Sequence, residues 1–108
     1  MNKYILAAMP FDKPVIITVE GELKPFPPKD ETYTLEELQE AVNGYIEIKR
    51  LVGDYVMVLD EEGRLNNKKF NPKATDLALQ CNDTLSGNYA VIDTIVGDVL
   101  LCRDEMID

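Results

Sequence analysis

The chain has 108 residues, of which 45% are hydrophobic, so it is long enough to bury the core of one domain. Eleven basic and twenty acidic residues give a net charge of −9. This balance argues against general binding to nucleic acid or to an anionic membrane, because both require a basic surface. The chain contains no histidine, which excludes Ser-His-Asp triads, Cys-His pairs and the commonest zinc sites.

Two strands are predicted in the N-terminal part, over residues 3–8 and 15–19, and a proline-rich, extended connection follows over residues 24–29. The N-terminus lacks a signal-peptide pattern, and no apolar run approaches the roughly 18 residues that a membrane span needs. Cys81 and Cys102 lie far apart and in no CxxC pattern, which indicates buried thiols in a reducing compartment. We therefore expect a cytoplasmic protein that does not contact membranes.

The stretch that follows predicts a helix over residues 34–43. Thr34 is a good N-cap, and Glu37 three residues later completes a capping box. The Asn43-Gly44 pair provides a C-terminal stop. The apolar residues at helical spacing, which should form the buried face, are Leu35, Leu38 and Val42.

A β-hairpin is predicted directly after this helix, over residues 45–60, with a two-residue turn at Gly53-Asp54. That turn sets a register in which Glu47 faces Asp60, and two carboxylates in direct opposition are unfavourable. One explanation is a bulge that shifts the pairing. The other is a cation or a hydrogen-bond donor held between the two carboxylates.

A second helix should begin at Asn71-Pro72, with Asn71 as its cap, and a last strand should lie between residues 89 and 102. Residues 104–108 form an acidic tail that we expect to be frayed. The order of elements predicts an α+β fold, a mainly antiparallel sheet with two short helices on one face. Residues 1–108 form a single domain, divided into N-terminal strands (1–32), a core (33–103) and the tail.

One segment is basic although the protein as a whole is acidic. Residues 64–73, here called the basic island, read RLNNKKFNPK and contain no acid. The segment ends at a helix N-terminus, where free N–H groups favour an anion such as phosphate. The alternative is a solvated basic turn that offsets neighbouring acids. The candidate ligand-binding residues are Arg64, Asn66, Asn67, Lys68, Lys69, Asn71 and Lys73.

Four segments occur in an order that resembles a small family of unknown function found in bacteriophages, plasmids and their bacterial hosts. They are LEELQEAVNGYIEI at 35–48, VMVLDEEGRL at 56–65, NPKAT at 71–75 and IVGDVLL at 95–101. Asn43 replaces the first glycine of the family's turn, and Asp60 stands where the family usually has asparagine. The resemblance implies a mobile-element protein acting in the host cytoplasm, and it implies no known reaction.

Two functions are compatible with these observations. The first is a non-enzymatic binding protein that sequesters a small anionic, nucleotide-type ligand such as a host immune signal, since capture needs positioned donors but no catalytic base. The second is an acidic, protein-binding inhibitor of a host enzyme that normally binds nucleic acid. An enzyme is less expected, because no nucleophile–base pair can be named. We expect no cofactor, no metal and no direct nucleic-acid contact, and we expect a homodimer.

Overall fold

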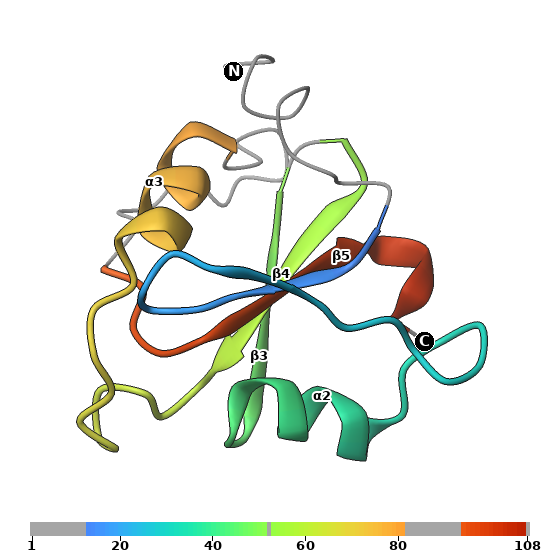
Figure 1. Cartoon of the computed structure of the whole chain (residues 1–108), viewed down its shortest axis with the longest axis horizontal. Coiled ribbons are helices and arrows are strands. Elements are labelled where there is room, and N and C mark those ends of the chain that lie inside the picture. Colours follow the sequence, from blue (N-terminus) through green and yellow to red (C-terminus); the bar gives the residue numbers. More distant parts are fainter. Residues whose placement is uncertain (1–12, 52, 82–93, 108) are drawn as a thin grey trace.

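The computed structural model describes residues 13–51, 53–81 and 94–107 (Figure 1). The predicted first strand, residues 3–8, lies outside the described residues, as does the start of the predicted last strand. The described strands form one antiparallel sheet of five in the order β2-β1-β5-β4-β3. In chain order the elements are β1 (Val15–Ile17), β2 (Leu23–Pro25), α2 (Leu35–Val42), β3 (Ile46–Arg50), β4 (Tyr55–Asp60), α3 (Pro72–Cys81) and β5 (Val99–Arg103).

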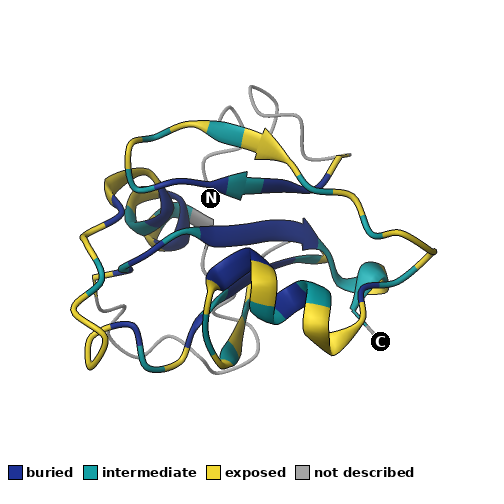
Figure 2. Cartoon of the chain, turned by 60° about the horizontal axis from the view of Figure 1, so that its bottom comes forward, coloured by how far each residue is buried: buried dark blue, intermediate teal, exposed yellow. Residues whose placement is uncertain are grey.

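The α+β fold and the antiparallel sheet are confirmed, but the prediction that both helices lie on one face is wrong. Met57 and Leu101 lie in one hydrophobic cluster with the buried side of α3. Their neighbours Val58 and Leu100 lie in a second cluster with the buried side of α2. Successive residues of a strand point to opposite faces, so each face of the sheet is covered by its own helix (Figures 1 and 2).

The hairpin of β3 and β4 is confirmed, but its register differs from the predicted one by one residue. The Leu51 N–H donates to the carbonyl oxygen of Tyr55 at 2.9 Å, so the two strands are paired up to Leu51 and Tyr55, with three residues between them in place of the predicted two. Glu47 consequently faces Leu59 rather than Asp60, and the expected carboxylate pair does not form. A slip of one residue exchanges the two faces of a strand. The apolar pattern could not fix the register because β4 is buried on both sides.

Helix α2 begins and ends where the sequence predicts. Thr34 and Glu37 form the capping box, and Asn43 takes the left-handed conformation at the C-cap with φ 57°. One predicted core residue is wrong, since Leu35 is 55% exposed and Ala41 is buried in its place. The yellow and dark blue sides of α2 in Figure 2 show this division between solvent and core.

The prediction of a frayed acidic tail is wrong for the described residues 104–107. A short 3-10 helix, η2 (Asp104–Met106), follows β5 directly. The Tyr33 N–H donates to the carbonyl oxygen of Met106 at 2.9 Å, and Tyr33 forms an isolated parallel bridge with Ile107. Asp104 also accepts a hydrogen bond from Arg50 at 2.8 Å. These contacts attach the segment to the start of α2 and to the end of β3.

Candidate binding surface

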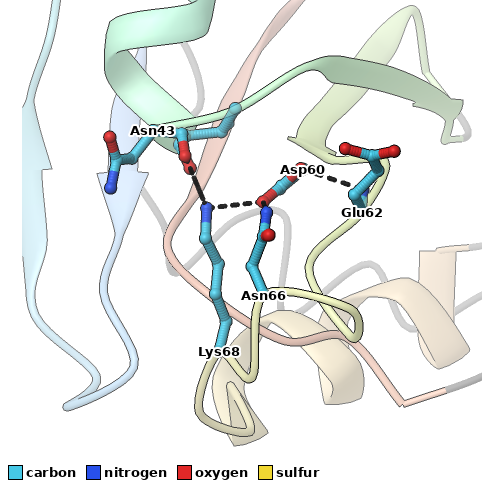
Figure 3. Close-up of polar contacts among 6 residues, drawn as sticks. Asn43, Asp60, Glu62, Asn66 and Lys68 are labelled. Atoms are coloured by element: carbon cyan, nitrogen blue, oxygen red, sulfur yellow. Dashed lines mark hydrogen bonds and ion pairs between the residues drawn. The ribbon is translucent and has the colours of Figure 1, made fainter.

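Asp60, at the end of β4, is the centre of a polar network between two parts of the chain (Figure 3). Its carboxylate accepts hydrogen bonds from the Glu62 N–H at 2.9 Å and from Asn66 Nδ2 at 3.1 Å. Lys68 Nζ lies 2.7 Å from Asp60 Oδ2. Burial, the largest single influence, opposes ionisation of Asp60, but these hydrogen bonds and the Lys68 charge together outweigh it and hold its pKa below the usual value.

Lys68 connects this carboxylate to the C-terminus of α2. Its Nζ also donates to the backbone carbonyl oxygens of Val42 and of Asn43, the latter at 2.9 Å. The last carbonyls of a helix have no partner within the helix, and the negative end of the helix dipole favours a cation there. Lys68 therefore anchors the loop over residues 61–69 to the end of α2, with its charge balanced by Asp60.

The same contact explains why residue 44 is glycine. A Cβ atom at Gly44 would lie 2.6 Å from Cγ of Asp60, far closer than a carbon contact permits. The sequence indicates a helix stop at the Asn43-Gly44 pair, but Asn43 alone supplies the left-handed residue. Gly44 is required instead by the close approach of Asp60, which sequence reasoning could not detect.

Two basic side chains of the island make local structural contacts. Arg64 donates through Nη2 to the carbonyl oxygen of Thr94 at 2.7 Å. Lys73 donates to the carbonyl oxygen of Gly21 at 3.0 Å. Asn67 and Lys69 are exposed, and neither side chain has a hydrogen bond or ion pair with another described residue.

Asn71 is confirmed as the cap of α3, since its Oδ1 accepts the Ala74 N–H at 3.0 Å. Its Nδ2 donates to the carbonyl oxygens of Ile17 at 3.0 Å and of Gly97 at 2.9 Å. The residue is 0% exposed, so it joins α3 to β1 and to the segment before β5. It does not reach a surface where a ligand could touch it.

Three grooves surround the Asp60 network, and we name each by its lining. The β3 groove, of about 550 Å³, includes Glu47, Lys49 and Arg64. The island groove, of about 510 Å³, brings together Asn66, Asn67, Lys68 and Lys69, together with the acids Glu40 and Asp98. The predicted ligand residues are thus divided, with four in one groove and Arg64 in another, while Lys73 lines none of the three.

The third groove, the acidic groove, has about 540 Å³ and lies beside α2. Glu36 and Glu40 stand one helical turn apart on the exposed side of α2, and Glu62 comes from the turn after β4. Tyr45, which is 65% exposed, lies between these elements. No lysine or arginine lies among the described lining residues, so this groove keeps its negative charge.

Together these features define an α+β domain in which a charged loop is held against one of two helices that cover opposite faces of a sheet. The sequence profile of the domain of unknown function DUF3846 matches residues 5–107, and the chain belongs to that family. No curated protein and no solved structure matches the chain. Among the described residues, no helix has the length and apolar character that crossing a membrane requires.

Proposed function

We propose that this protein is a non-enzymatic binding protein whose acidic groove holds a basic side chain of a partner protein. The observation that carries the proposal is that Glu36, Glu40 and Glu62 line one groove together with the exposed Tyr45. None of these three carboxylates takes part in a salt bridge within the described part of the chain. In the same loop, Lys68 is already paired with Asp60, and Arg64 donates to the carbonyl oxygen of Thr94.

Arginine is the side chain that such a groove suits best. Its planar guanidinium can bond a carboxylate through two parallel hydrogen bonds, and it also stacks on an aromatic face. Glu36 and Glu40 offer carboxylates on one side, while Tyr45 offers the aromatic face. The Glu62 N–H donates to the Asp60 carboxylate, and this hydrogen bond holds the turn. The backbone that carries the third carboxylate, that of Glu62, is therefore fixed.

The net charge of −9 extends this argument from one side chain to a whole surface. Complementary charge accelerates association and selects partners with a basic face. A host enzyme that normally binds nucleic acid has such a face. The resemblance to proteins of bacteriophages and plasmids supports a role as an inhibitor of that kind in the host cytoplasm.

Calorimetry with arginine-rich and lysine-rich peptides of equal charge tests the proposal. The variant Glu36→Gln with Glu40→Gln should weaken arginine-peptide binding at least about tenfold, since a hydrogen bond to a charged group contributes about 1.5–3 kcal/mol. The matched control is Glu20→Gln with Glu31→Gln, which removes the same charge from exposed positions outside the three grooves. Equal weakening in both variants would show that only net charge matters and would overturn the groove as a site.

A second candidate function is capture of a small anionic, nucleotide-type ligand in the island groove. The favouring observation is that Asn66, Asn67, Lys68 and Lys69 share this groove, with Asn67 and Lys69 exposed. Against it, Asp60 already balances the charge of Lys68. A ligand that binds only the folded protein raises its melting temperature. A nucleotide panel should then raise the melting temperature of the parent but not of Lys69→Gln, and no shift with any nucleotide would reject this candidate.

A further inference from the structure

The two edges of the described sheet differ in how well they are protected. One edge is β2, which has three residues and ends in Pro25, a residue that cannot donate a hydrogen bond to a further strand. The other edge is β3, which has five residues and no proline. Among the described strands, β3 pairs only with β4. Within the described part of the chain, its outer side is therefore open to another strand.

The backbone groups that face this open side follow from the hairpin's hydrogen bonds. The Leu51 N–H donates to Tyr55 O at 2.9 Å, and the Glu61 N–H donates to Tyr45 O at 2.8 Å. Residues of an antiparallel strand alternate between bonding to one neighbour and to the other. Odd-numbered residues of β3 thus bond to β4, and the N–H and C=O groups of Ile46, Ile48 and Arg50 point outward.

We propose that β3 pairs with β3 of a second copy of this chain, antiparallel and around a two-fold axis at Ile48. Residues whose N–H and C=O groups point away from β4 must lie opposite such residues of the partner. Ile46 therefore faces the partner's Arg50, and Ile48 faces the partner's Ile48. Glu47 then faces the partner's Lys49, and the symmetry makes this contact twice. These two residues occupy a non-hydrogen-bonded position, where side chains across an antiparallel pair lie closest.

Charge selects this register over its neighbours. A shift by two residues in one direction would place Glu47 opposite the partner's Glu47, and a shift in the other direction would place Lys49 opposite the partner's Lys49. Like charges in direct opposition are unfavourable, whereas opposite charges stabilise the pair. Within the described chain neither Glu47 nor Lys49 forms a salt bridge, so both charges are available. Ile48 is 40% exposed and would gain an apolar neighbour.

The proposed pairing also concerns the β3 groove, because Glu47, Ile48 and Lys49 contribute to its lining. A second copy on the open side of β3 would place its own Glu47 and Lys49 beside this groove. The acidic groove involves none of these residues, so the dimer does not depend on the function proposed above.

Sedimentation equilibrium of the full chain tests the proposal, at about 0.15 M salt, where charges farther apart than about 8 Å are screened. The parent should approach twice the chain mass of 12.2 kDa as its concentration rises. Glu47→Lys alone and Lys49→Glu alone should each dimerise at least about tenfold more weakly, because both contacts become repulsive. Mixing these two variants should restore dimers, since each lysine then meets a glutamate of the other chain.

Two further variants separate pairing from folding. The double exchange of Glu47→Lys with Lys49→Glu should dimerise like the parent. Ile48→Pro removes only an outward N–H, so it should abolish dimers while the β3–β4 ladder keeps its hydrogen bonds. A parent that stays at 12.2 kDa throughout would overturn the proposal. Single-exchange variants that dimerise like the parent, or mixtures that fail to restore dimers, would also overturn it.

Discussion

Lys68 Nζ and the Asp60 carboxylate lie 2.7 Å apart in an ion pair that is almost entirely enclosed, with 16% and 1% of the two side chains exposed. The pair connects the end of β4 with the C-terminus of α2, because Lys68 also bonds to the Asn43 carbonyl oxygen. Removing one member of a buried pair leaves the other as an uncompensated charge.

Lys68→Met should lower the free energy of unfolding by about 3 kcal/mol, because Asp60 keeps its buried charge and the helix end loses a donor. Urea unfolding followed by circular dichroism measures this difference. Lys69→Met is the matched control, since Lys69 is exposed and should change stability by less than about 0.5 kcal/mol. Equal effects of the two substitutions would mean that the buried pair does not stabilise the fold.

Asp60→Asn should make stability less dependent on pH. The folded-state pKa of Asp60 is below its usual value, so its ionised form contributes stability above the unfolded pKa of about 3.9. That contribution is lost as the pH falls through the folded-state pKa. The difference in unfolding free energy between the parent and Asp60→Asn should be constant near neutral pH and should shrink in acid. A difference that grows in acid would contradict the assigned direction.

Asn71→Ala should cost about 3 kcal/mol, more than the roughly 1 kcal/mol typical of a lost helix cap, because two buried carbonyls also lose their donor. Asn71→Asp distinguishes these contributions. It keeps the oxygen that caps α3 but replaces the amide donor to Ile17 and Gly97. If thermal unfolding shows that the aspartate restores parental stability, only the cap matters and the bonds to these carbonyls contribute nothing.

Cys102 should resist thiol reagents in the folded protein. Burial, and secondarily the charge of Asp104, raises its pKa to about 12, and the thiolate is the reactive form. In a Cys81→Ser background, a chromogenic disulfide reagent at mildly alkaline pH should label Cys102 only after denaturant is added. Rapid labelling under native conditions would show that the central strand opens readily.

The parts of the fold that the sequence predicts are those whose signals are local. The capping box of Thr34 and Glu37 and the left-handed Asn43 together specify α2 within ten residues of chain. The register of the hairpin could not be predicted in the same way. Val56, Met57 and Val58 are all buried, so alternation of apolar and polar residues gives no preference between two registers.

The candidate site is harder to predict, because the role of its residues depends on partners that are distant in the sequence. The cations of the basic island are evident in the sequence, but their use is not. Lys68 donates to the carbonyl oxygens of Val42 and Asn43, which precede it by 26 and 25 positions in the sequence. It also forms an ion pair with the carboxylate of Asp60. A basic segment indicates that an anion lies nearby, and the anion that Lys68 contacts is the Asp60 carboxylate of the protein itself.

The position of β5 has a consequence for how the protein is made. It follows the other four described strands in the chain, yet it lies between β1 and β4 at the middle of the sheet. A ribosome releases the β1–β2 and β3–β4 hairpins first, and isolated hairpins are marginally stable in water. Neither can join the other until Val99–Arg103 has left the exit tunnel. The nascent chain should thus gain resistance to proteolysis in one late step, after these residues have emerged from the ribosome.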